Sequence, residues 1–119
     1  MSEEFLRVAK QEVSDDISAI GNLLNECSDD YSIHKQASEI EKHIHKIKGL
    51  APMMNQERIG RIAEMLDKLF KAVMSGKTVP GLYSTAKKSY EFMHSEINGV
   101  RTDFENIESD ITRNHASFL

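Results

Sequence analysis

The chain has 119 residues, of which 39% are hydrophobic and 29% charged, and its formal net charge is −4. This length suits one domain spanning residues 1–119, and the slightly acidic balance gives no general electrostatic attraction to nucleic acid. No apolar run approaches the ~18 residues of a membrane span, and MSEEFLRVAK lacks the basic and apolar regions of a secretory signal, so we expect a cytoplasmic protein that binds no nucleic acid and no membrane.

Apolar residues recur at spacings of three and four in the first half of the chain, which predicts amphipathic helices. The first stripe consists of Phe5, Leu6, Ala9, Val13, Ile17, Ile20, Leu24 and Cys27. The polar segment SDDYS then interrupts the pattern, and Ser32 is expected to cap the next helix. The second stripe consists of Ile33, Ala37, Ile40, Ile44, Ile47 and Ala51. We expect this helix to end near Met53 or Met54, with Asn55 as a left-handed cap.

The second half of the chain carries two further stripes. The third consists of Ile59, Ile62, Ala63, Leu66, Leu69, Phe70 and Val73. After a loop with Gly76 and Pro80, the last stripe consists of Leu82, Ala86, Tyr90, Met93, Ile97, Val100, Phe104, Ile107 and Ile111. The tail TRNHASFL is expected to fray. Four helices with short connections predict an all-α fold, an antiparallel up-and-down four-helix bundle with a long C-terminal helix.

The outer face of the second predicted helix carries the residues with the most specific chemistry. Beside its buried isoleucines runs a row that consists of Glu41, His45, Lys48 and Pro52. His45 and Lys48 are three residues apart, hence about 60° around the helix axis and about 4.5 Å along it, so their side chains can touch. Gly49 lies on the same surface, whereas His43 lies about 200° away from His45 and does not share its site.

A histidine, a lysine and a glycine in this arrangement have a joint chemical interpretation. Histidine side chains have a pKa of about 6.5 in model peptides, so a neutral ring nitrogen is available as a nucleophile near neutral pH. An ammonium group beside it neutralises an arriving phosphoryl group, and a glycine leaves room for the active site of another protein. The alternative is a solvated surface histidine beside a surface lysine, with Gly49 serving only helix packing. The helix tolerates both Gly49 and Pro52 close to His45, which favours the functional interpretation.

The segment HKIKGLAPMMN resembles the motif of the histidine phosphotransfer (HPt) family, in which His-x-x-Lys-Gly precedes small residues and a hydrophobic one. The likeness is strongest to the N-terminal phosphoacceptor domain of chemotaxis histidine kinases. It extends over roughly the first 100 residues and includes IAEMLDKLFKAVMSGK. The resemblance implies that His45 is phosphorylated on its distal ring nitrogen, that Lys48 pairs with the phosphoryl oxygens, and that Gly49 leaves space for the partner.

Two positions depart from the chemotaxis branch of this family. There, a glutamate on the third helix accepts a hydrogen bond from the other ring nitrogen, and Asp67 stands at that position here. Aspartate is one methylene shorter, so we expect the contact to be absent or bridged by water. A second histidine of that branch is replaced by Glu64. The resemblance makes His45, Lys48 and Asp67 the candidate catalytic residues, and the residues expected to contact a partner are Glu41, Lys46, Gly49, Pro52 and Met53.

Pro52 stands where the family usually has a small residue. Its ring crowds the carbonyl of Lys48 and it lacks a backbone N–H, so we expect a local bend that shapes the docking surface. Met53 and Met54, in the following connection, are expected mainly to fill gaps in the core, and the alternative is a methionine-lined patch that adapts to several receivers.

No metal site is expected. Glu91 and His94 match the Glu-x-x-His spacing of di-iron bundle proteins, but such a site needs a second copy that the sequence lacks. Glu41 and His45 are one helical turn apart, yet no third ligand is evident.

These residues lead to one predicted function and two alternatives. We expect a phosphocarrier of a two-component phosphorelay that is not itself an enzyme, because no nucleotide-binding motif is present. Its partners would be a histidine kinase and response-regulator receiver domains, and it would need no cofactor because the receiver supplies Mg²⁺. The alternatives are a phosphoacceptor fragment of a chemotaxis-type histidine kinase and a non-catalytic helical interaction module.

Overall fold

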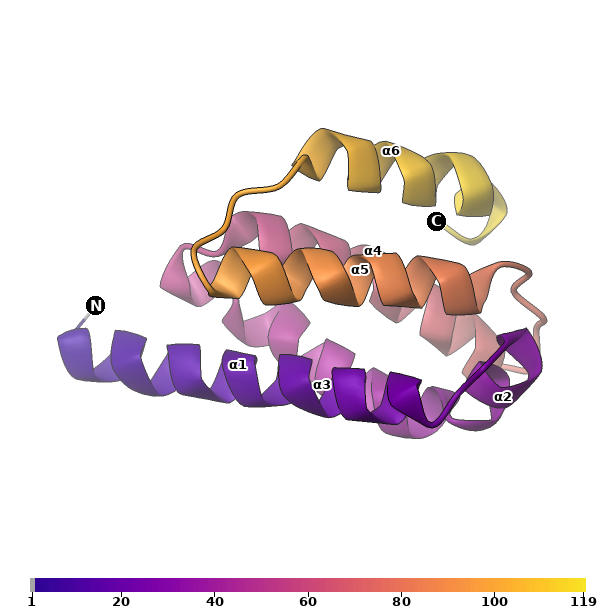
Figure 1. Ribbon diagram of the computed structural model, residues 1–119, viewed down its shortest axis with the longest axis horizontal. Coiled ribbons are helices and arrows are strands. Elements are labelled where there is room, and N and C mark those ends of the chain that lie inside the picture. Colours follow the sequence, from indigo (N-terminus) through magenta and orange to yellow (C-terminus); the bar gives the residue numbers. More distant parts are fainter. Residues whose placement is uncertain (1) are drawn as a thin grey trace.

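The computed structural model describes residues 2–119, and its regular elements are all helices. The α-helices in this range are α1 (Glu3–Asn25), α2 (Asp30–Lys35), α3 (Ala37–Leu50), α4 (Glu57–Met74), α5 (Leu82–Ile97) and α6 (Phe104–His115). Short 3₁₀ helices follow α3 and α6, namely η1 (Pro52–Met54) and η2 (Ala116–Phe118). Residues 2–119 contain no strand, which confirms the predicted all-α class (Figure 1).

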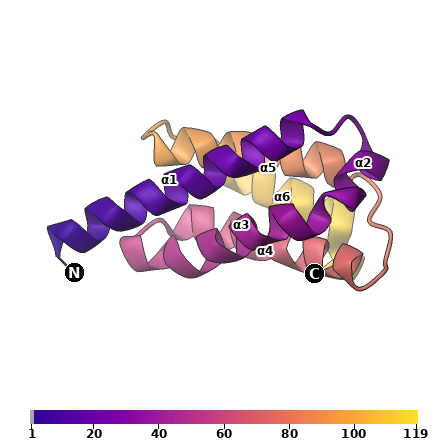
Figure 2. The ribbon, with the colours of Figure 1, turned by 90° about the horizontal axis from the view of Figure 1, so that it is seen from below.

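The four longest helices pack around a shared core. α1 contacts α3 and α5, and α4 contacts the same two helices, so each of the four has two neighbours. α6 packs on α4 and α5, on the side away from α1 (Figure 1). Figure 2 shows the N-terminal end of α1 extending beyond the other helices. Because α6 covers α4 and α5 only, the outer face of α3 remains open, with His45, Lys46 and Gly49 exposed on it.

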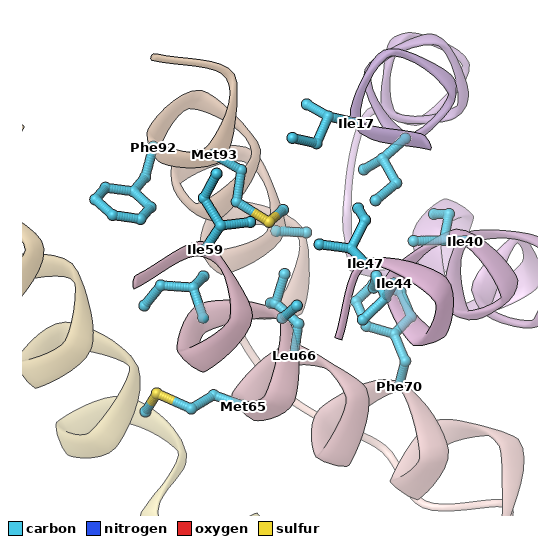
Figure 3. Close-up of a cluster of buried hydrophobic side chains, with 14 of the residues drawn as sticks. Ile17, Ile40, Ile44, Ile47, Ile59, Met65, Leu66, Phe70, Phe92 and Met93 are labelled. Atoms are coloured by element: carbon cyan, nitrogen blue, oxygen red, sulfur yellow. The ribbon is translucent and has the colours of Figure 1, made fainter. Parts of the chain in front are cut away.

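The apolar stripes of these helices meet in the core. The fully buried side chains labelled in Figure 3 include Ile17, Ile40, Ile44, Ile47, Ile59, Leu66, Phe70 and Met93. Burying each such side chain stabilises the fold by about 1.5–3 kcal/mol. Cys27 is also buried, as expected for a small residue at the end of the first stripe. No helix within residues 2–119 combines the length and the apolar character needed to cross a membrane.

The helix after the SDDYS segment begins earlier than predicted. Asp29, and not Ser32, caps α2, because the Asp29 carboxylate accepts a hydrogen bond from the Ser32 amide at 2.9 Å. The Ser32 hydroxyl accepts in turn from the Asp29 amide at 3.1 Å, which completes a capping box. The prediction that Ser32 is the cap was therefore wrong, since Ser32 fills the third helical position, where Glu or Gln usually completes this motif.

The second predicted helix is divided into two. A break at Gln36 separates α2 from α3. The carboxylate of Asp30 on α2 accepts hydrogen bonds from the amides of Gly81 and Tyr83, both at 2.8 Å. These bonds hold α2 against the start of α5 and join residues more than 50 positions apart in sequence. Local periodicity carries no sign of them, which is why a single helix was predicted.

The long C-terminal helix predicted over residues 82–111 was also wrong. α5 ends at Ile97, and Gly99 adopts a left-handed φ of 82° that L side chains rarely tolerate. Val100, expected in the buried stripe, is 56% exposed in the connection that follows. α6 then begins after Asp103, whose carboxylate caps it. α5 and α6 both bury apolar residues at helical spacing, so the apolar pattern of the sequence continues across the connection that separates the two helices.

The tail predicted to fray is instead packed. α6 continues to His115, which is only 2% exposed, and η2 follows it. The Nε2 atom of His115 lies 2.7 Å from the Thr85 hydroxyl on α5, and burial lowers the pKa of His115. This contact between α5 and α6 ties down a segment whose own sequence looks polar.

Candidate functional site

His45 lies on the open face of α3. The helix turns its isoleucines into the core and leaves the side chain of His45 56% exposed. His43 lies on another side of α3, where its Nδ1 atom is 2.9 Å from an Asp16 carboxylate oxygen on α1. Lys46 also reaches Asp16, at 3.0 Å. As predicted, the two histidines have separate surroundings, and only His45 is mainly exposed.

Asp67 on α4 faces His45 across the contact between α3 and α4. It is 2% exposed, and its Oδ2 atom accepts hydrogen bonds from Lys48 on α3 and Lys71 on α4, both at 2.8 Å. Charge-assisted hydrogen bonds of this length are among the stronger ones in proteins. Lys48 and Asp67 are predicted from the sequence, but Lys71 is not. The signal was available, because Lys71 follows Asp67 by four residues, the spacing at which opposite charges pair on a helix.

The imidazole of His45 lies close to two carboxylates but is hydrogen-bonded to neither. Its Nδ1 atom is 3.7 Å from Glu41 Oε2 and 3.8 Å from Asp67 Oδ2, outside the usual N–H···O range of 2.7–3.2 Å. The distance to Asp67 agrees with the expectation that the shorter aspartate fails to reach the ring directly. Glu41 was predicted as a partner contact, but it is only 8% exposed and lies against this group instead.

The two carboxyl groups have opposite pKa shifts. Hydrogen bonding to Asp67, burial and the charge of Asp67 all raise the pKa of Glu41. Burial also raises the pKa of Asp67, but hydrogen bonds from Glu41 and the two lysines outweigh burial and lower that pKa to about 2. Glu41 therefore takes up a proton before Asp67 as the pH falls. Asp67 stays ionised and paired with Lys48 and Lys71 at neutral pH.

Glu41, His45 and Asp67 are also of the residue types that bind metal ions. Glu41, His45 and Asp67 each offer one ligand atom, and these atoms lie within 4.8 Å of one another. The structure thus supplies the third ligand that was not evident in the sequence. However, the ammonium groups of Lys48 and Lys71 already bind Asp67 and repel a cation. A metal ion would have to displace both, and we assign none to this group.

The surface beyond His45 is open at Gly49 and shaped by Pro52. A Cβ atom at Gly49 would meet no atom within 4 Å, so packing inside the protein does not require glycine there. α3 ends at Leu50 and the 3₁₀ helix η1 begins at Pro52, so the α-helix stops where the proline ring was expected to disturb it. Pro52 packs on Gly60 of α4, where an added Cβ would lie 2.7 Å from Pro52 Cγ. Gly60 is therefore a packing glycine that the sequence analysis did not identify.

The two methionines after Pro52 have different surroundings. Met54 is 9% exposed and contributes to the core, whereas Met53 is 51% exposed and extends the surface around Pro52. Glu64, which replaces a histidine of the chemotaxis branch, accepts a hydrogen bond from Arg61 at 2.6 Å instead of joining the group around His45. The exposed surface near His45 thus comprises Gly49, Pro52 and Met53.

No protein-family model matches the chain, and neither does any curated protein or solved structure. The likeness to the histidine phosphotransfer family stays a prediction, and its support is the geometry around His45.

Proposed function

We propose that this chain is a histidine phosphotransfer protein of a two-component phosphorelay. In this proposal His45 accepts a phosphoryl group from a histidine kinase or a phosphorylated receiver domain and passes it to a receiver aspartate. The observation that carries the proposal is the exposed imidazole of His45, with Lys48 anchored beside it and open surface over Gly49. We also infer that α1, α3, α4 and α5 form an antiparallel up-and-down four-helix bundle.

The charges around His45 suit a phosphoryl group. Asp67 carries one negative charge but binds the ammonium groups of both Lys48 and Lys71. One of these cations can therefore turn toward a phosphoryl group on the Nε2 atom of His45 while the other keeps Asp67 neutralised. Lysine stems are long and flexible, so this exchange requires no movement of the backbone.

The shape of the surface suits a transient partner. Gly49 adds no side chain between His45 and an approaching protein, and Met53 offers an adaptable apolar contact beside Pro52. The receiver would bring its own Mg²⁺ and aspartate, so this protein would need no cofactor. Contacts of this kind belong to interfaces below about 1,200 Å² in total. A phosphorelay of this type operates in the cytoplasm.

A phosphorylation assay tests the proposal. The wild-type protein and the variant His45→Gln are incubated with a receiver domain that carries a radiolabelled aspartyl phosphate. We expect acid-labile, alkali-stable label on the wild type and none on His45→Gln. The matched control is His94→Gln, which removes an exposed histidine that lies beside Tyr90 on α5. Label that persists on His45→Gln, or a wild type that takes none from several donors, would contradict the proposal.

A further inference from the structure

We propose that Glu41, and not Asp67, accepts the hydrogen bond from Nδ1–H of His45 and thereby keeps the Nε2 lone pair of the ring free for reaction. This inference rests on the proposed phosphotransfer function and assigns to Glu41 the role of a positioning residue. The resemblance to the chemotaxis kinases suggests a residue on the third helix for this role, whereas the geometry here favours one on the helix that carries His45.

The two carboxylates are almost equally far from Nδ1 of His45, at 3.7 Å for Glu41 and 3.8 Å for Asp67, but their other contacts differ. The Asp67 oxygen nearest to the ring already accepts from Lys48 and Lys71 at 2.8 Å each. Glu41 accepts no hydrogen bond from a lysine, arginine or backbone amide within residues 2–119. The other oxygen of Asp67, Oδ1, has no hydrogen-bond partner in the part of the chain that the structure describes, but it is buried and is not the oxygen nearest to the ring. Once Glu41 is ionised and no longer donates to Asp67, its lone pairs are therefore the ones best placed to accept from the imidazole N–H.

The mobility of the groups points the same way. Asp67 is 2% exposed, short and bound by two lysines, so it has little freedom to approach the ring. Glu41 is one turn before His45 on α3, with a longer side chain, and the imidazole itself is 56% exposed. Small rotations of these two side chains shorten 3.7 Å to hydrogen-bonding distance without moving the backbone.

The hydrogen bond has a direct consequence for phosphoryl transfer. The Nε2 lone pair forms the new N–P bond, the P–O bond to the donor aspartate breaks, and its electron pair leaves on the donor carboxylate. The proton on Nδ1 stays where it is, and the ring becomes positively charged. A carboxylate at Nδ1 holds that proton in place and stabilises the charge that develops on the ring.

Nitrogen NMR of the histidine rings tests this assignment without any phosphodonor. Long-range ¹H–¹⁵N correlation spectra distinguish the Nδ1–H and Nε2–H tautomers at about pH 8, where model imidazoles are neutral. We expect Nδ1–H for His45 in the wild type and in Asp67→Asn, and mainly Nε2–H in Glu41→Met, which keeps the length but not the acceptor. Glu41→Gln, whose amide oxygen can still accept, should lie between them. His43, bound to Asp16, serves as an internal reference for Nδ1–H in each folded variant.

The same variants are then phosphorylated. We expect Glu41→Met to react roughly tenfold more slowly than the wild type, with part of the rate restored in Glu41→Gln. A wild-type ring in the Nε2–H form, or a tautomer that changes in Asp67→Asn but not in Glu41→Met, would overturn the assignment. A wild type that shows the expected tautomer but accepts no phosphoryl group would instead contradict the proposed function.

Discussion

The two sides of α3 carry the same types of side chain, but these side chains make different contacts. Toward α1, Asp16 binds His43 at 2.9 Å and Lys46 at 3.0 Å. Toward α4, Asp67 binds Lys48 at 2.8 Å, but His45 remains 3.8 Å away. Each side thus combines a buried aspartate, a histidine and a lysine.

The two sides differ in whether the histidine remains accessible to a partner protein. The side chain of His43 is 27% exposed and its Nδ1 atom is already hydrogen-bonded to a carboxylate of another helix. The side chain of His45 is 56% exposed and makes no hydrogen bond within residues 2–119. Composition alone would rank the two histidines equally, so the distinction depends on which helix each one faces. We interpret the α1 side as structural and the α4 side as reactive.

Replacing each histidine in turn should have the largest effect and tests most directly whether the two sides of α3 differ in function. His45→Gln should abolish phosphorylation, whereas His43→Gln should keep the rate within about threefold of the wild type. His43→Gln should nevertheless lower the free energy of unfolding by about 1–3 kcal/mol, because Asp16 loses a partner while buried. Rates of labelling and urea denaturation curves measure the two effects. A His43→Gln protein that folds but takes no label would remove the distinction between the two sides.

Replacing the lysines of the α4 side should have the next largest effect on the phosphorylation rate. Lys48→Ala removes the ammonium group that the proposal pairs with the phosphoryl oxygens and should slow phosphorylation by roughly tenfold to a hundredfold. Lys71→Ala should have a smaller effect, because Lys48 remains on Asp67 and can serve both roles in turn. The double variant should be slower than either single one. Equal rates for Lys48→Ala and the wild type in stopped-flow measurements would contradict the role of Lys48.

Two of the helical glycines, Gly49 on α3 and Gly60 on α4, give a third, smaller contrast. Gly60→Ala places a methyl group 2.7 Å from Pro52 Cγ and should destabilise the protein by about 1–3 kcal/mol. Gly49→Ala meets open space and should stabilise α3 by about 0.5–1 kcal/mol, yet weaken binding to a receiver several-fold. Thermal unfolding measures the stability changes of both variants, and the KM for a phosphorylated receiver measures how Gly49→Ala affects binding. A stabilised Gly49→Ala with unchanged KM would mean that partners do not approach there.

The sequence predicts the helical class and the location of the candidate site because both depend on local spacing. The periodicity of α3 places His45 outside and the isoleucines inside, and Lys48 follows from the same geometry. The errors occur where distant contacts decide the structure. The bonds of Asp30 to the start of α5 divide a predicted helix, and the left-handed Gly99 divides another while the apolar spacing continues. The proposed preference of His45 for Glu41 over Asp67 likewise depends on Lys71, a residue of α4.

The charge state of Asp67 gives the next prediction. Hydrogen bonds to Asp67 outweigh the effect of burial and lower its pKa from 3.8 to about 2. A lowered pKa stabilises the folded state above the unfolded value of 3.8, and this stabilisation is lost as the pH falls from 3.8 toward 2. It amounts to at most about 2 kcal/mol. Urea denaturation of the wild type should therefore show a steeper loss of stability in this window than that of Asp67→Asn. Parallel curves would mean that the lysines do not hold Asp67 as tightly as their distances indicate.

Glu41 should show the smallest effect, with the opposite sign. Hydrogen bonding to Asp67, burial and the Asp67 charge raise the pKa of Glu41 above its usual 4.5, so its contribution to stability is present below 4.5 and is lost as the pH rises through the raised pKa. The ionised form of Glu41 therefore opposes folding, and at pH values above its raised pKa Glu41→Gln should unfold at a higher urea concentration than the wild type. A variant that gains stability while its phosphorylation slows would indicate that the protein retains an unfavourable carboxylate because His45 needs it. If Glu41→Gln loses stability in that pH range, Glu41 instead serves the fold.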